Sequence, residues 1–143
     1  MFHDIEQKIV ERLKAVLPAE VHVATETDIQ AVEELRKLAP ACWVIYDGFS
    51  VGDRIANGAV QSVSQEWQIV VAAQSAKGRG NAAAARDEAG ELALQVLQAL
   101  LGFHIGGGKY LHLADAPGPI YSAGYCHLPL AFTNAATFKG QTT

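Results

Sequence analysis

The apolar residues between Ala82 and Leu101 are too dense for a helix that packs on one side only. From Ala89 onward almost every position outside one narrow polar stripe is apolar. A surface helix normally shows water about half of its circumference. The pattern therefore predicts a long helix with one side on a sheet and the other against a second helix, a second sheet or a neighbouring subunit. The polar stripe consists of Asp87, Glu88, Glu91, Gln95 and Gln98.

Two other helices are predicted before this one. Residues 2–17 place Ile5, Ile9 and Leu13 on one face and charged residues on the rest, an ordinary amphipathic pattern that Pro18 ends. A brief helix is predicted over residues 28–38, with Thr27 as its N-cap.

The strand patterns divide between short runs and one long run. Short strands are predicted at residues 21–24, 42–46 and 110–113. A long strand is predicted over residues 60–74, with a polar first half that could project past the core and a second half that is apolar on both faces, as in a central strand. Residues 49–58 are interpreted as a mobile loop or a hairpin tip.

The final strand is predicted over residues 121–133, where Cys126 and Phe132 face one way and Tyr125 and His127 the other. Because Pro129 cannot donate a ladder hydrogen bond, this strand is expected at a sheet edge or with its proline on an unpaired side. The pattern predicts a single domain over residues 1–134 and a flexible C-terminal tail over residues 135–143.

Composition narrows the function classes. The chain has 143 residues, half of them hydrophobic, and a formal net charge of −4, which fits one globular domain and does not favour nucleic-acid binding. The start, Met1–Glu6, carries acidic residues where a signal peptide has basic ones, and no run reaches the ~18 apolar residues of a membrane span. Cys42 and Cys126 have no CxxC spacing and are expected to be buried free thiols.

The sharpest enzyme-like motif is the GxGxxA at Gly78–Ala83, between a strand and a helix. Such a turn can hold a pyrophosphate against a helix N-terminus, so a small-molecule or nucleotide-binding α/β protein is a rival hypothesis. Four residues separate the buried strand from Gly78, however, and Asp115 lies well beyond the expected ~20-residue offset. A flexible loop is the favoured interpretation.

No other catalytic or cofactor-binding pattern is present in the sequence. The five histidines do not pair at metal-ligand spacing, and there is no GxSxG motif. His127 is interpreted as a packed or interfacial histidine rather than a base. We therefore expect neither an enzyme nor a cofactor, and the excess apolar surface favours a protein that assembles.

Three stretches resemble the small tail protein of Mu-like phages and prophages. They are the opening Ile5–Lys14, the strand and turn Trp43–Gly48, and Trp67–Ala73 with Arg86 beyond it. The order of the later elements fits as well, and the resemblance covers most of residues 1–134. That family in turn resembles the tail terminators of long-tailed phages.

The resemblance implies an α+β fold: one mixed, mostly antiparallel sheet packed by an N-terminal helix and one long central helix. It also implies that six copies form a ring on the tail tube, stop polymerisation of the tube and of any sheath, and present a surface to the head connector. The source would be a phage, a prophage or an R-type bacteriocin particle. A head–tail adaptor protein is a second rival.

A ring of identical subunits needs two different faces on each copy. The candidates for the interface are Leu94, Leu97 and Leu101 on the long helix and Tyr125, His127 and Pro129 on the last strand. Those for contact with the tube or sheath are Arg54, Gln61, Gln65, Lys77 and Arg79.

The resemblance and the charge also imply a location and a set of partners. We expect synthesis in the bacterial host cytoplasm, a final place in the virion tail, and no membrane partner. The acidic net charge would let DNA pass through the ring without specific binding.

Overall fold

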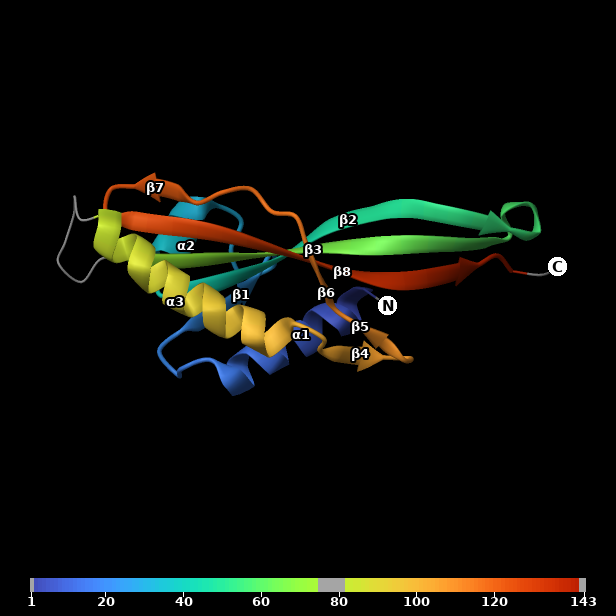
Figure 1. Ribbon diagram of the computed structural model, residues 1–143, viewed down its shortest axis with the longest axis horizontal. Coiled ribbons are helices and arrows are strands. Elements are labelled where there is room, and N and C mark those ends of the chain that lie inside the picture. Colours follow the sequence, from blue (N-terminus) through green and yellow to red (C-terminus); the bar gives the residue numbers. More distant parts are fainter. Residues whose placement is uncertain (1, 75–81, 142–143) are drawn as a thin grey trace.

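The computed structural model describes residues 2–74 and 82–141. Within them, three α-helices, one 3₁₀ helix and eight strands form a single α+β domain (Figure 1). The helices are α1 (Phe2–Val16), α2 (Val32–Leu38), η1 (Ala56–Gly58) and α3 (Ala82–Leu100). The strands are β1 (His22–Thr25), β2 (Ala41–Ile55), β3 (Val60–Gln74), β4 (His104–Gly106), β5 (Lys109–Tyr110), β6 (His112–Ala114), β7 (Ile120–Ser122) and β8 (Tyr125–Lys139).

The main sheet has the order β1-β2-β3-β8-β6, and β7 also pairs with β8. β1 runs parallel to β2, and the other pairs are antiparallel. The mixed, mostly antiparallel sheet implied by the resemblance is therefore confirmed. β3 occupies exactly the predicted residues 60–74 and lies between the two other long strands.

Helices cover both faces of one half of this sheet. α1 and α3 lie on one face and α2 lies on the other (Figure 1). The larger core joins α1 and α3 to the sheet through buried residues such as Leu13, Trp67 and Phe132. A smaller core under α2 is centred on Leu35. We call this helix-covered half of the molecule the body.

The second side of α3 is covered by α1, which confirms that this helix is buried on two sides. Burial within the chain accounts for most of its apolar residues, including Leu92, Val96 and Leu100. The Arg12 Nε–H of α1 donates to the Ala99 carbonyl at 3.0 Å, which satisfies one of the free carbonyls in the last turn of α3. Gly102 adopts φ +69° after the helix, as expected of a C-terminal glycine.

Beyond the body, β2, β3 and β8 continue together as a three-stranded arm (Figure 1). We define the arm as residues 48–66 and 134–139. Of the two interpretations of residues 49–58, the mobile loop is wrong, because β2 pairs with β3 as far as Ile55–Val60. The hairpin tip is correct, but only for residues 56–58. Only η1 and Ala59 form the hairpin tip, where Asn57 has φ 58°.

The predicted C-terminal tail was also wrong over residues 135–139. These residues belong to β8 and pair with residues 60–64 of β3. Ala136 and Phe138 alternate with Thr137 and Lys139, but two apolar positions are too short a run to mark a strand. The pairing arises instead because β3 is equally long and offers a partner at every position.

Two smaller boundaries differ from the prediction. The second helix begins at Val32, since the Asp28 carboxylate accepts the Thr25 N–H at 2.9 Å and holds residues 25–28 in a turn. The predicted strand over residues 121–133 contains a hairpin turn at Ala123–Gly124, which separates β7 from β8.

Pro129 lies inside the sheet rather than on an edge strand. It pairs with Val70 of β3 on one side. On its other side it falls between the residues that pair with β7, 125–127, and those that pair with β6, 131–133. On that side, β8 has no partner strand at Pro129, which is the second of the two expected arrangements.

Candidate assembly surfaces

The outer face of α3 keeps a small apolar patch. Leu94 and Leu101 are each 50 % exposed, while Leu97 is half-buried against the core. The two exposed leucines lie seven residues apart, and they therefore share one face of the helix. This α3 patch is much smaller than the apolar surface expected from the sequence, because α1 already covers the rest.

The three interface candidates on β8 are largely hidden by the chain itself. His127 is only 4 % exposed and Pro129 is buried, so neither offers much surface to a second copy. Tyr125 is half-buried, with the Arg36 guanidinium of α2 5.8 Å from its ring centre. The sequence showed the alternation of β8 correctly but not that Arg36 of α2 lies beside its second face.

The surroundings of His127 favour its neutral form. Burial lowers the pKa of His127 below the ordinary 6.5, and the neighbouring Arg36 lowers it further, against a smaller opposing effect of Glu33. Among the described residues, no group within hydrogen-bonding distance pairs with Nε2. His127 is a packed histidine in this structure.

We expect the free energy of unfolding to decrease as the pH falls from 6.5 toward about 5. A histidine whose pKa is lower in the folded state binds a proton more readily in the unfolded chain, so its stabilising effect is complete above 6.5 and is lost below it. Urea unfolding at several pH values measures this change. The variant His127→Phe should show a shallower decrease, and an equal decrease in both proteins would contradict the assignment.

The predicted tube contacts are divided between exposed and buried positions. Arg54 is exposed near the arm tip. Gln61 is half-buried, and its Nε2 donates to the carbonyls of Gly52 and Asp53 at 2.9 and 3.1 Å, which braces the irregular register of β2 there. Lys77 and Arg79 lie outside the described residues, as do residues 78–81 of the GxGxxA motif.

Gln65 is 1 % exposed, so its prediction as a tube contact was wrong. It belongs to a buried series of side-chain hydrogen bonds at the root of the arm, where the arm joins the body. The Trp67 Nε1–H donates to Asn134 Oδ1 at 2.8 Å, and Asn134 Nδ2 donates to Gln65 Oε1 at 2.9 Å. Asn134 is also 1 % exposed. Sequence reasoning missed these hydrogen bonds, since Gln65 and Asn134 look like surface residues and their pairing depends on the register of β3 and β8.

One face of the arm is apolar and exposed along β2. Phe49 and Val51 of β2 are 54 % and 61 % exposed. The Phe49 ring lies 6.4 Å, centre to centre, from that of Phe138 on β8. Val51 and Ala136 both pair with Val63 on the same face. We call Phe49, Val51, Val63, Ala136 and Phe138 the arm patch, although Val63 and Ala136 are only 3 % and 5 % exposed. Its sequence signals are the alternating apolar residues 49 and 51 and the pair 136 and 138.

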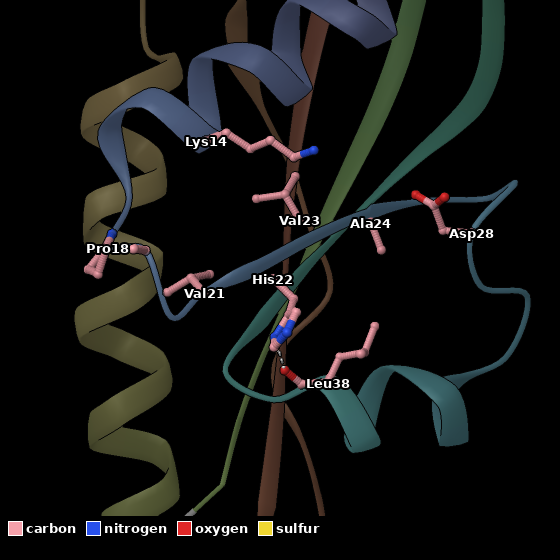
Figure 2. A pocket seen from close by; sticks show the side chains of 9 residues that line it. Lys14, Pro18, Val21, His22, Val23, Ala24, Asp28 and Leu38 are labelled. Carbon is pink, nitrogen blue, oxygen red and sulfur yellow. Dashed lines mark hydrogen bonds between the residues drawn. The ribbon is translucent and has the colours of Figure 1, made fainter.

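A hollow of about 530 Å³ lies beside β1, the outermost strand of the body (Figure 2). Lys14 reaches over it from α1, and Asp28 and Leu38 border it from the segments after β1. His22 Nδ1 lies 2.8 Å from the Leu38 carbonyl and donates to it. The hollow is shallow and mixed in character, and it brings together no group with an obvious catalytic role.

The described residues show neither a metal site nor a reactive cysteine. Within residues 2–74 and 82–141, no three side chains of the His, Cys, Asp and Glu types gather as a metal site. Both cysteines are buried and free, as predicted. Burial raises the pKa of Cys42 to about 12 and also raises the pKa of Cys126, so both are protonated at neutral pH. No helix of the described chain is long and apolar enough to span a membrane.

Comparison with known proteins agrees with a role in assembly. A family model described as phage tail terminator protein matches residues 2–142. A comparison with curated proteins matches none of them. The family match extends over nearly the whole chain and includes both the body and the arm. The chain therefore belongs to the phage tail terminator protein family.

Proposed function

We propose that this protein forms a ring, with six copies as the expected number, on the end of the tail tube. The ring stops further polymerisation of the tube, and of the sheath where one exists, and presents a surface to the head connector. The observation that carries the proposal is the family match over residues 2–142 of a chain whose arm exposes the apolar side chains of Phe49 and Val51. Membership of the Mu-like type remains a prediction.

The surfaces of the chain fit a closed ring. Head-to-tail contact between identical copies uses two different patches of each subunit, and it closes when the rotation between copies is a whole fraction of a turn. The α3 patch lies on the body and the arm patch lies beyond it, so the two are separate surfaces (Figure 1). The net charge of −4 gives no general attraction for phosphate, which suits a ring through which DNA passes.

The direct test is tail length in electron micrographs. Tails assembled without this protein should be longer than normal and vary in length, and the purified chain should restore uniform length and appear at one end of the tube. Tails of normal length in its absence would contradict the proposal. Binding to capsid portals but not to tubes would favour the head–tail adaptor.

The α3 patch gives a second, sharper test by charge substitution. The double variant Leu94→Glu, Leu101→Glu should weaken ring formation strongly, because carboxylates would have to be desolvated in the interface. Both leucines are half exposed in one chain, so melting should change by only a few degrees. Native mass spectrometry at several concentrations measures assembly.

The matched control is Gln98→Glu, which adds a charge at an exposed position of the same helix. It should assemble nearly as the unmodified chain does. Unchanged rings in the double variant would exclude the α3 patch from the interface without affecting the proposed function.

A further inference from the structure

The arm has two edges on which the described chain supplies no partner strand. β1 pairs with β2 only at residues 41–44, so residues 48–55 of β2 are unpaired on their outer side. β6 pairs with β8 only at residues 131–133, so residues 134–139 are unpaired on theirs. Each edge is a row of backbone N–H and C=O groups available to another strand.

Proteins usually protect such edges with prolines, short strands, inward-pointing charges or β-bulges. Neither segment contains a proline, and their charged residues, Asp53, Arg54 and Lys139, all lie near the tip. The register shift within the β2 edge, between Val51 and Arg54, also lies toward the tip. Between the root and the tip, both edges are long and bear only apolar or small polar side chains. Edges of this kind are expected where another strand covers them.

We propose that the β2 edge of one copy, residues 48–55, pairs with the β8 edge of the next copy, residues 134–139. The inference rests on the proposed ring and specifies one of its contacts. A second copy is the fitting occupant, because the two free edges lie on opposite sides of one arm and have similar lengths. Each copy therefore offers the edge that its neighbour lacks, and the contact repeats around the ring.

The direction of the strands is consistent with this contact. β2 and β8 both run antiparallel to β3, and so they run parallel to each other. Rotation about an axis along the arm preserves direction, so the new pair is parallel. If the two edges pair without a stagger, Val51 of one copy lies opposite Ala136 of the next, since both residues pair with Val63 of β3. The arm patch then continues from copy to copy.

At the tip, the same register places Ile55 of one copy beside Lys139 of the next and Arg54 beside Phe138, since these residues pair with Val60 and Gln61 of β3. With six copies, three strands from each arm close a barrel of about 18 strands, a size that leaves an open channel in membrane barrels.

Disulfide formation between introduced cysteines tests the pairing. Ser50 and Ala135 are exposed on one face and both pair with Ser64, which puts them at the same level. The variant S50C/A135C tests an unstaggered register and S50C/T137C a stagger of two residues. Under oxidation, at least one of them should give a ladder of oligomers that ends at the ring number in denaturing gels.

The matched control is V51C/A135C, whose cysteines lie on opposite faces of the arm and should remain unlinked. The native Cys42 and Cys126 are buried and should not contribute. Single variants should not form the ladder, because the contact joins two different positions.

Hydrogen exchange gives a readout that does not depend on register. Amides in residues 48–55 and 134–139 of the unmodified chain should exchange at least about tenfold more slowly in the ring than in the monomer. The β1 edge, His22–Thr25, serves as the internal reference. Rings that show neither cross-links nor this protection would overturn the edge pairing alone. A chain that forms no ring, free or on tail tubes, would overturn the proposed function with it.

Discussion

A chain with a shortened arm is expected to keep its fold and to leave tails overlong. The variant replaces residues 51–63 by Asn-Gly and ends after residue 135. Ser50 and Ser64 pair with each other, so a two-residue turn can join them. The variant keeps all three α-helices and the buried hydrogen bonds that join Gln65, Trp67 and Asn134.

The expected loss is specific to assembly, because the deleted residues lie outside the main core, although Val63 and Ala136 among them are buried within the arm. Of the deleted part of β2, Val51 and Ile55 are 61 % and 60 % exposed. Circular dichroism should show a cooperative unfolding transition close to that of the full chain, while electron micrographs show tails of irregular length. Tails of normal length would mean that the arm has no part in termination. The control replaces only η1 by a tight turn, which leaves both edges intact.

The second large effect is expected at the root of the arm. Asn134→Ala should lower the free energy of unfolding by about 2–4 kcal/mol, because it leaves the buried Trp67 N–H and Gln65 carbonyl without partners and opens a small cavity. Urea denaturation with tryptophan fluorescence measures the change. A loss below about 0.5 kcal/mol, typical of exposed positions, would contradict the hydrogen-bonded arrangement.

Two further variants separate the hydrogen bond from the packing. Trp67→Phe removes the donor, and Asn134→Leu fills the site of the acceptor with an apolar side chain of similar size. If the bond is as described, the double variant should lose less than the sum of the two single losses. Additive losses would mean that the two side chains do not interact.

The body could be predicted from the sequence since its signals are local. The spacing of Ile5, Ile9 and Leu13 gives α1, the glycine at 102 ends α3, and the apolar run after Trp67 gives the central part of β3. The two-sided burial of α3 followed from its composition. That the second side belongs to α1 could not be derived, because a helix and a neighbouring subunit offer the same kind of apolar surface.

The β3 part of the arm was predicted as the first half of the long strand, but the pairing of β8 with it could not be predicted, because that pairing is not local. Residues 135–139 form a strand through β3, which lies far away in the sequence. The same register buries Gln65 and Asn134, two residues that polarity alone assigns to the surface. The small helix α2 lies close to His127 through Glu33 and Arg36, and His127 is buried although the alternation of β8 had suggested it for an interface. The predictions of candidate site residues were wrong where an element distant in the sequence buries the residue.

The link between α1 and the residues after α3 has a consequence for the order of folding. Lys8 donates to the Ile105 carbonyl at 2.7 Å across 97 positions, and Arg12 reaches Ala99 across 87. Contacts this distant form slowly, because a long loop of chain must close first. During synthesis, α1 can contact β1 and β2 early, but its contacts with α3 and Ile105 form only after about residue 106 has left the ribosome. A chain released earlier therefore exposes part of the apolar stripe of α1 to chaperones and proteases.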